Sequence, residues 1–345
     1  MSEPTSNSSR VLFISFKSKF ISSKLIGMFC VCLLLVLACW LHLAYGAKSL
    51  DGQVIWQALF NYDNSNSEQI LVREMRLNRL LVSLIVGAAL ALAGVLVQAV
   101  SRNPLADPGI LGINSGAAFF VVAGLLFISG SRSLSVPLLA FSGALFAALL
   151  VAALSGRQQS SGRMILAGAA VAALFSAMTA VLLLVDQQGL EKLRNWLTGS
   201  VSASDINKLD WVMPYLVPAM LGAMLLAKSL NTHHLGDMAA SGLGVKVARL
   251  KLFALLAIVV LSGSAVALVG PIGFIGLVVP HMARFLIRND FRWLLPYSLI
   301  LGAAVMVSAD LMGRILVRPY EINTGIVTAL IGAPVFIALV IWRVR

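Results

Sequence analysis

The chain carries a series of apolar runs, each long enough to cross a lipid bilayer. A membrane-spanning helix needs about 20 predominantly apolar residues. Ten such stretches can be drawn, at residues 25–45, 79–100, 109–129, 135–154, 163–184, 211–229, 252–270, 273–288, 293–313 and 323–343. The runs are continuous rather than alternating, which argues against a transmembrane β-barrel. The sequence therefore predicts a single all-α, polytopic membrane domain over residues 1–345, with its eighth span short and broken at Pro280.

Composition supports lipid as the solvent of this chain. Hydrophobic residues make up 59% of it and charged residues 12%, against about 25% charged in a soluble domain. The three cysteines, Cys30, Cys32 and Cys39, all fall in the first span and have no partner at metal-binding spacing. We interpret them as packed or lipid-facing thiols. Residues 1–24 are polar and basic, and we predict a cytoplasmic tail that leads into an uncleaved first span.

The charges predict which side of the membrane each loop occupies. With the N-terminus inside, the inner loops and tails hold sixteen Lys and Arg and four acidic residues, while the outer ones hold ten of each. Basic loops stay in the cytoplasm, so both termini are predicted to be cytoplasmic. The net charge of +12 is then explained by the basic cytoplasmic loops, and it does not imply a nucleic-acid partner.

Small residues crowd the second and fifth spans, at Gly87–Gly94 and Gly168–Ala173. Such faces predict close contact between helices. Spans two to five begin on the outer side, whereas spans seven to ten begin on the inner side. Two four-helix groups of opposite orientation suit an inverted repeat.

Residues 231–251, NTHHLGDMAASGLGVKVARLK, interrupt the apolar pattern. The stretch is too polar and too rich in glycine to cross a membrane, and Lys246, Arg249 and Lys251 place it inside. Its small residues would let the backbone of another protein come close. We interpret it as two short helices with a glycine break, on which a partner pushes. An ordinary basic loop is the alternative.

Residues 101–116, SRNPLADPGILGINSG, form a second distinctive cytoplasmic segment. Two prolines bracket a polar turn, which predicts a rigid re-entry into the next span with Asn103 and Leu105 at its tip. The alternative is a plain helix-breaking loop.

Arginines gather at the outer ends of two spans. Arg76 and Arg79 lie three residues apart, so a helix would place them on one face, and Arg314 and Arg318 end the ninth span. They could form a docking surface for acidic groups. The alternative is snorkelling of long side chains to the membrane interface.

Together these stretches resemble the permease subunits of the iron-siderophore and cobalamin group of ATP-binding-cassette importers, the type II importers. The resemblance runs from about Arg73 to the C-terminus. Asn78 stands where the family usually has proline, and Ser241 where it commonly has arginine. The matching text is Arg76-Leu77-x-Arg79, GAALALAG (87–94), NPLADPGILG (103–112), RMILAG (163–168), LGDMAASGLGV (235–245), GPIGFIGLVVPHMAR (270–284) and TGIVTALIGAPVFI (324–337).

The resemblance implies a complex in the bacterial cytoplasmic membrane. Two ten-span permease subunits, identical or paralogous, would form the pathway. Two copies of a cytoplasmic ATP-binding subunit would drive it, and an extracytoplasmic substrate-binding protein would deliver the cargo. That cargo would be a ferric siderophore, with cobalamin or haem as the alternatives.

The resemblance also assigns roles to particular residues. The binding protein would dock at Arg76, Arg79 and Arg314. A cytoplasmic gate would involve Asn103, Leu105, Ser161 and Gly162. The ATPase would couple through Leu235, Gly236, Asp237, Ala239, Ala240, Leu243 and Gly244.

Other functional classes fit the sequence less well. No G-x-x-x-x-G-K-[ST] motif is present, so the energy has to come from a partner. No acid–base pair or metal cluster is evident, and we predict neither an enzyme nor a cofactor. A membrane-embedded enzyme would need such a constellation. An ion-coupled secondary transporter would keep ionisable residues at its span centres, whereas Asp186 and Asp310 lie near the outer ends.

Overall fold

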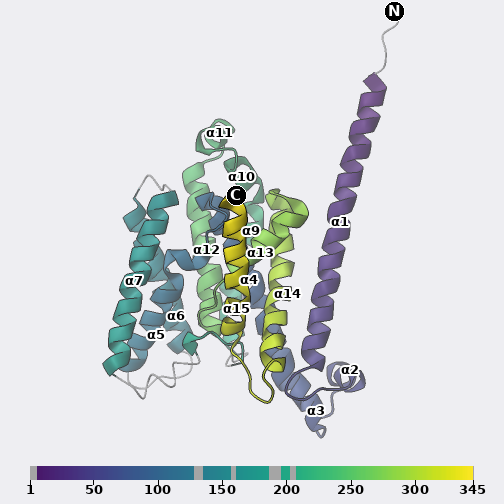
Figure 1. Cartoon of the computed structure of the whole chain (residues 1–345), viewed down its shortest axis with the longest axis vertical. Helices are drawn as coiled ribbons and strands as arrows, with labels where there is room; N and C mark the ends of the chain where they lie inside the picture. The colour runs from purple at the N-terminus through teal and green to yellow at the C-terminus, as the bar shows by residue number, and fades with distance from the viewer. Residues whose placement is uncertain (1–5, 128–134, 157–160, 186–195, 203–206, 345) are drawn as a thin grey trace, which may run out of the picture.

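The helices of the computed structural model run between two ends of one bundle (Figure 1). The structure describes residues 6–127, 135–156, 161–185, 196–202 and 207–344, with side chains from Lys24 onward except for a few positions, Ser161 among them. No strand occurs in these ranges, which confirms the all-α prediction. Within them, six helices are long and apolar enough to span a membrane, and a pair bent by 48° would make a seventh.

The long helices are α1 (Ser6–Ala44), α4 (Leu77–Ser101), α6 (Ser135–Ser155), α7 (Ser161–Val185), α12 (Val247–Val269) and α14 (Phe291–Ile315). The bent pair is α9 (Asn207–Leu225) with α10 (Ala227–His233). The shorter apolar helices are α5 (Ile113–Phe127), α13 (Ile275–Ile287) and α15 (Thr324–Val344). These elements correspond one to one to the ten predicted spans. The small elements are α2 (Gly52–Phe60), α3 (Ser67–Ile70), the π-helix η1 (Leu71–Arg76), the 3-10 helix η2 (Pro108–Leu111) and α11 (Asp237–Gly242).

The predicted break at Pro280 is wrong, because α13 runs through it. A proline inside a helix leaves the carbonyl four residues earlier without its amide donor. That carbonyl belongs to Gly276, and Gln98 Nε2 of α4 donates to it at 3.2 Å. A side chain from the neighbouring helix thus replaces the missing backbone bond.

The third span starts later than predicted. Residues 108–111 form η2, which begins where the Asp107 carboxylate accepts the Gly109 N–H. Gly112 ends this turn with φ of +70°, a conformation that favours glycine. The transmembrane helix α5 therefore begins only at Ile113.

Helix α4 lies at the centre of the bundle. Within the Ser67–Ser101 span, 83% of the most apolar stretch is buried, against 17% for Lys24–Ala44 of α1. Helices α12, α13 and α14 pack around α4. A Cβ on Gly87 would lie 2.3 Å from the Gly302 carbonyl oxygen, and one on Gly94 would lie 1.9 Å from that of Gly276. The predicted close contacts of the second span are therefore confirmed.

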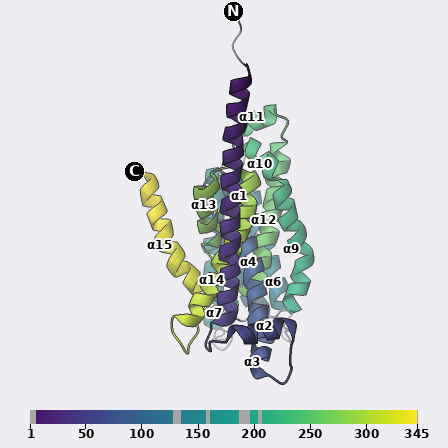
Figure 2. The same ribbon diagram turned by 90° about the vertical axis from the view of Figure 1, so that its right-hand side faces the viewer.

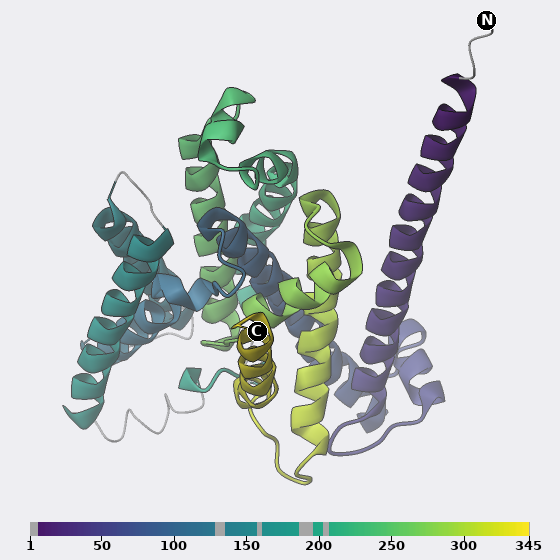
Figure 3. The ribbon, with the colours of Figure 1, turned by 45° about the horizontal axis from the view of Figure 1, so that its top comes forward.

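The elements at the two ends of the bundle differ. Helix α11 and the start of α1 lie at one end, and α2, α3 and the α14–α15 connection lie at the other (Figures 1 and 2). Helices α5, α6 and α7 form a group on the side away from α1 (Figure 3). Helix α15 leans outward, on the side opposite α9 (Figure 2).

Some predicted segments take a different form or fall outside the described ranges. The tail predicted for residues 1–24 is helical from Ser6. Residues 231–251 contain the end of α10, a break at Gly236, then α11 and the start of α12. The outer link near Arg132 and much of the outer segment 187–210 lie outside the described residues. The inverted repeat stays a prediction.

Candidate functional site

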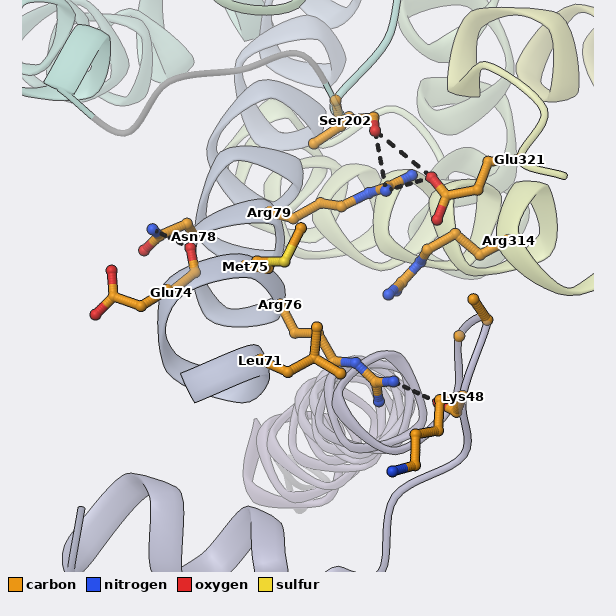
Figure 4. A pocket seen from close by; sticks show the side chains of 13 residues that line it. Lys48, Leu71, Glu74, Met75, Arg76, Asn78, Arg79, Ser202, Arg314 and Glu321 are labelled. Atoms are coloured by element: carbon orange, nitrogen blue, oxygen red, sulfur yellow. Dashed lines mark hydrogen bonds and ion pairs between the residues drawn. The ribbon is translucent and has the colours of Figure 1, made fainter. Parts of the chain in front are cut away.

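The three arginines predicted for docking line one pocket at the α2 end (Figure 4). Its volume is about 490 Å³. The polar residues that line it with them are Lys48, Glu74, Asn78, Ser202 and Glu321. The structure thus brings Arg76, Arg79 and Arg314 together, and their docking role stays a prediction.

Two of these arginines cap the C-terminus of α1. The last carbonyls of a helix have no amide donor within it. Arg76 Nη1 donates to the carbonyls of Leu43 and Ala44, and Arg314 Nη2 donates to that of His42 at 3.1 Å. Cations at this position also complement the helix dipole. Arg76 and Arg314 are only 5% and 4% exposed, so both have a structural role that the sequence did not reveal.

Arg79 lies between two carboxylates. Its Nε and Nη2 bind the two oxygens of Asp310 at 2.8 and 2.9 Å, a bidentate arrangement that is strong and directional. Its Nη1 lies 2.7 Å from Glu321 Oε2 and 3.3 Å from the Ser202 hydroxyl. Asp310 is fully buried, so this pair is closed to water, whereas the pair with Glu321 lies at the pocket surface.

Asp310 connects four helices. His42 Nε2 of α1 lies 2.9 Å from its Oδ2, and the Thr324 hydroxyl of α15 donates to its Oδ1 at 2.8 Å. Arg79 comes from α4, and Arg314 from α14 lies 3.4 Å away. Removing one member of a buried ion pair costs about 3–5 kcal/mol. This network therefore holds the ends of α1, α4, α14 and α15 together beside the pocket.

At the opposite end, the segment predicted as a gate forms an ordered turn. The Asn103 side-chain oxygen accepts the Leu105 N–H at 3.0 Å. Asp107 accepts the Gly109 N–H at 2.8 Å, and a Cβ on Gly276 of α13 would lie 3.2 Å from Asp107 Oδ1. Burial raises the pKa of Asp107 to about 6, although the Gly109 N–H opposes this.

The remaining gate residues lie at the start of α7. The Ser161 side chain is outside the described part of the structure. Gly162 is exposed, and a Cβ there would have nothing within 4 Å. The described chain therefore does not bring Gly162 against Asn103 or Leu105, and the gate stays a prediction.

The predicted coupling segment forms an exposed apolar shelf around α11. Leu235 is 67% exposed and Leu243 66%, and Met238 between them is 91% exposed. Gly236 precedes the helix with φ of +116°, and Gly244 follows it with φ of +84°. Exposed apolar groups gathered in this way mark interaction surfaces. We name residues 235–244 the α11 shelf.

Individual shelf residues differ in exposure. Ala239 is exposed, whereas Ala240 is fully buried beneath the helix. Met238 was missed as a candidate, although it stands between the predicted Leu235 and Leu243 in the sequence and is more exposed than either. Asp237 is paired: Lys251 Nζ lies 3.0 Å from one oxygen, and Arg102, which follows α4, donates to the other. Despite partial burial, these cations lower the pKa of Asp237.

No group of three or more His, Cys, Asp or Glu within the described ranges is placed to hold a metal ion. The described residues instead provide a charged pocket at one end, an apolar shelf at the other, and membrane helices between them. This arrangement defines a polytopic helical membrane protein.

The family follows from comparison with known proteins. The model of the FecCD transport family matches residues 34–342, and the chain belongs to this family. It is 44% identical over 319 residues to the ferric enterobactin transport system permease protein FepD of Escherichia coli, covering 91% of this chain and 94% of that protein. It is 41% identical to the probable siderophore transport system permease protein YfiZ of Bacillus subtilis, covering 92% and 96%.

A solved structure has the same fold. It is described as an inward-facing conformation of a metal-chelate type ABC transporter, and it superposes with a TM-score of 0.78 at 32% identity. The match covers 91% of this chain and 97% of that one. The predicted resemblance to type II importer permeases is thereby confirmed.

Proposed function

We propose that this chain is the membrane permease of an ATP-driven importer that carries ferric siderophores across the bacterial cytoplasmic membrane. The similarity to a ferric enterobactin permease over 91% of the chain carries this proposal. The energy comes from a separate ATP-binding subunit, since the sequence holds no phosphate-binding loop of its own.

The transporter contains two permease subunits, identical or paralogous, and two ATP-binding subunits. The α11 shelf lies in the cytoplasm with both chain termini and receives the ATP-binding subunit. Its exposed Leu235, Met238 and Leu243 support this role, because apolar groups of this size gain free energy when a partner covers them.

An extracytoplasmic binding protein docks over the pocket at the α2 end. Arg79 offers its guanidinium edge at the pocket surface, and Arg76 and Arg314 add positive charge behind it. Asn103, Leu105, Ser161 and Gly162 form the cytoplasmic gate once a second permease subunit stands beside the first.

Uptake in a strain that lacks this gene tests the proposal. The strain is supplied with labelled ferric siderophores of the catecholate, hydroxamate and citrate types, and with haem and cobalamin. We expect uptake of at least one ferric siderophore to be lost and to return with the wild-type gene. Loss of haem or cobalamin uptake alone would contradict the cargo.

The energy source is tested separately. In the complemented strain, the P-loop lysine of the cognate ATP-binding subunit is replaced by alanine. We expect uptake to stop although the complex still assembles. Uptake that persists, and that an ionophore abolishes, would identify an ion-coupled secondary transporter instead.

A further inference from the structure

The two carboxylates bound to Arg79 differ sharply in exposure. The Asp310 side chain is completely buried, whereas that of Glu321 is 37% exposed. Breaking a buried pair leaves a charge without compensation and is strongly unfavourable. An ion pair that water reaches contributes little. Asp310 therefore fixes Arg79 in place, and the position that Glu321 occupies on Nη1 is open to exchange.

That exchangeable position faces the pocket. Glu321 reaches Arg79 from the α14–α15 connection. Glu74 also lines the pocket, but its side chain points away from Arg79 (Figure 4). The pocket volume of about 490 Å³ is ample for an aspartate or glutamate side chain. Arg76 and Arg314 line the same pocket and add positive charge, so an incoming carboxylate is attracted to this place. Lys48 at the rim is 64% exposed, but it is already paired with Glu68 at 2.6 Å.

We propose that Glu321 is an intramolecular placeholder for an acidic side chain of the binding protein. On docking, the incoming carboxylate takes Nη1 of Arg79, Glu321 moves into solvent, and Asp310 keeps the guanidinium in position. This inference rests on the proposed docking function of the pocket and adds the group that docking displaces. One carboxylate replaces another, so the charge at Arg79 stays balanced.

Release of Glu321 also acts on the connection between α14 and α15. Glu321 lies three residues before Thr324, the first residue of that helix. The bonds from Ile322 N to the Gly313 carbonyl and from Gly325 N to the Gly199 carbonyl, both 2.9 Å, do not involve Glu321. Docking therefore loosens the α14–α15 connection while the first turn of α15 stays anchored.

The test measures the affinity of siderophore-loaded binding protein for the full complex in lipid nanodiscs at low salt. Glu321→Gln removes the competing charge, and we expect binding to tighten about 2- to 5-fold, the range for a partly exposed ion pair. Glu321→Asp keeps the charge but shortens the reach to Arg79, and it should tighten binding as well. Unchanged or weaker binding by both variants would overturn the proposal.

Glu74→Gln is the matched control. Glu74 is an exposed carboxylate of the same pocket, so its loss changes the net charge equally without freeing Arg79. If it tightened binding as much as Glu321→Gln, the effect would be general electrostatics and the placeholder role would fail. All differences should shrink at high salt, because screening weakens exposed charge pairs.

The failure of docking itself would look different. Arg79→Lys keeps a cation beside the buried Asp310 but lacks the Nη1 that Glu321 binds. If this single change leaves the affinity for the binding protein unchanged, the pocket does not receive that protein and both ideas fail. If Arg79→Lys weakens binding while Glu321→Gln and Glu321→Asp have no effect, docking stands and the placeholder alone is refuted.

Discussion

Arg102, the residue that directly follows α4, donates a hydrogen bond to Asp237, the first residue of α11. Asn103 of the proposed gate follows Arg102 directly. The ion pair therefore joins the proposed gate segment to the α11 shelf, on which the ATP-binding subunit is proposed to act. We therefore expect a displacement of the shelf to reach the proposed gate through this contact. Lys251 of α12 binds the other oxygen of the same carboxylate.

Breaking this contact should weaken the coupling of ATP hydrolysis to transport. For Arg102→Gln and Asp237→Asn we expect less substrate carried per ATP hydrolysed, with the ATP-binding subunit still bound. The pair is partly exposed, so protein stability should change by less than about 1 kcal/mol. Because both variants break the same contact, their combination should be no worse than the more severe single change.

Arg292→Gln serves as the control for Arg102→Gln. Arg292 is an exposed arginine in the first turn of α14, and its loss changes the charge equally without touching Asp237. We expect wild-type coupling in this variant. Additive defects in the double variant, or an equal defect in Arg292→Gln, would exclude a specific link between Arg102 and Asp237.

The α11 shelf makes a second prediction. Ala239 is exposed on α11, so Ala239→Trp adds bulk on the proposed contact surface without disturbing the packing beneath it. We expect the ATP-binding subunit to co-purify poorly and uptake to fall, with membrane insertion unchanged. Leu225→Trp, at an exposed position of α9, should leave association intact. Normal association and uptake with Ala239→Trp would refute the role of the shelf.

Asp107 predicts a dependence of stability on pH. Burial raises the pKa of its carboxyl from about 4 in the unfolded chain to about 6. The folded protein therefore favours the neutral form, and wild-type stability falls as the pH rises from about 4 to about 6. Asp107→Asn stays neutral and retains an oxygen for the Gly109 N–H. Its unfolding temperature should exceed that of the wild type more at pH 7.5 than at pH 5.

Asp63→Asn is the control, because the pKa of Asp63 is shifted in the opposite direction from that of Asp107. Bonds from the Ser65 amide and hydroxyl lower the pKa of the Asp63 carboxyl, so its charged form is the favoured one. Its replacement should give no gain at pH 7.5. If the unfolding temperature of Asp107→Asn exceeded that of the wild type equally at both pH values, the Asp107 carboxyl would already be ionised below pH 5.

The caps on α1 predict that Arg76 contributes to stability. Arg76→Gln removes donors from the carbonyls of Leu43 and Ala44, and charged hydrogen bonds of this kind contribute about 1.5–3 kcal/mol each. We expect a clear fall in the unfolding temperature of the purified permease. Among the described residues, Arg73→Gln, in the same turn, loses the contact with the Tyr62 ring at 4.5 Å, and it should cost less than about 1 kcal/mol. If both variants unfolded at the same temperature, Arg76 would not stabilise the protein by capping α1.

The role of Arg76 shows what the sequence could not supply. Docking and snorkelling, the two alternatives drawn from the sequence, both assume an exposed side chain. The cap depends on α1 ending beside Arg76, which is a tertiary relationship. His42 was missed for the same reason, because its partner Asp310 lies 268 residues away along the chain. The spacing of Asp310 and Arg314, four residues apart on one helix, was a local signal that could have been used.

Local signals did predict the spans and the close contacts of the second span. Most spans are continuous apolar runs, which can be read within about 20 residues. The small residues of α4 predicted close packing with another helix. They did not indicate that Gly302 and Gly276 are the residues in contact. Pro280 was misread because the compensating donor, Gln98, comes from another helix.

The contact between Gly94 and Gly276 yields the last prediction. A Cβ on Gly94 would lie 1.9 Å from the Gly276 carbonyl oxygen, and a backbone atom cannot turn aside as a flexible side chain can. Gly94→Ala should therefore force α4 and α13 apart and cost more than the roughly 1–3 kcal/mol of ordinary overpacking. Gly222→Ala in α9 has nothing within 4 Å of the new methyl group and should be neutral or stabilising by up to about 1 kcal/mol. Thermal unfolding of the two purified variants measures the contrast, and a Gly94→Ala protein that melts with the wild type would show that the two helices do not meet here.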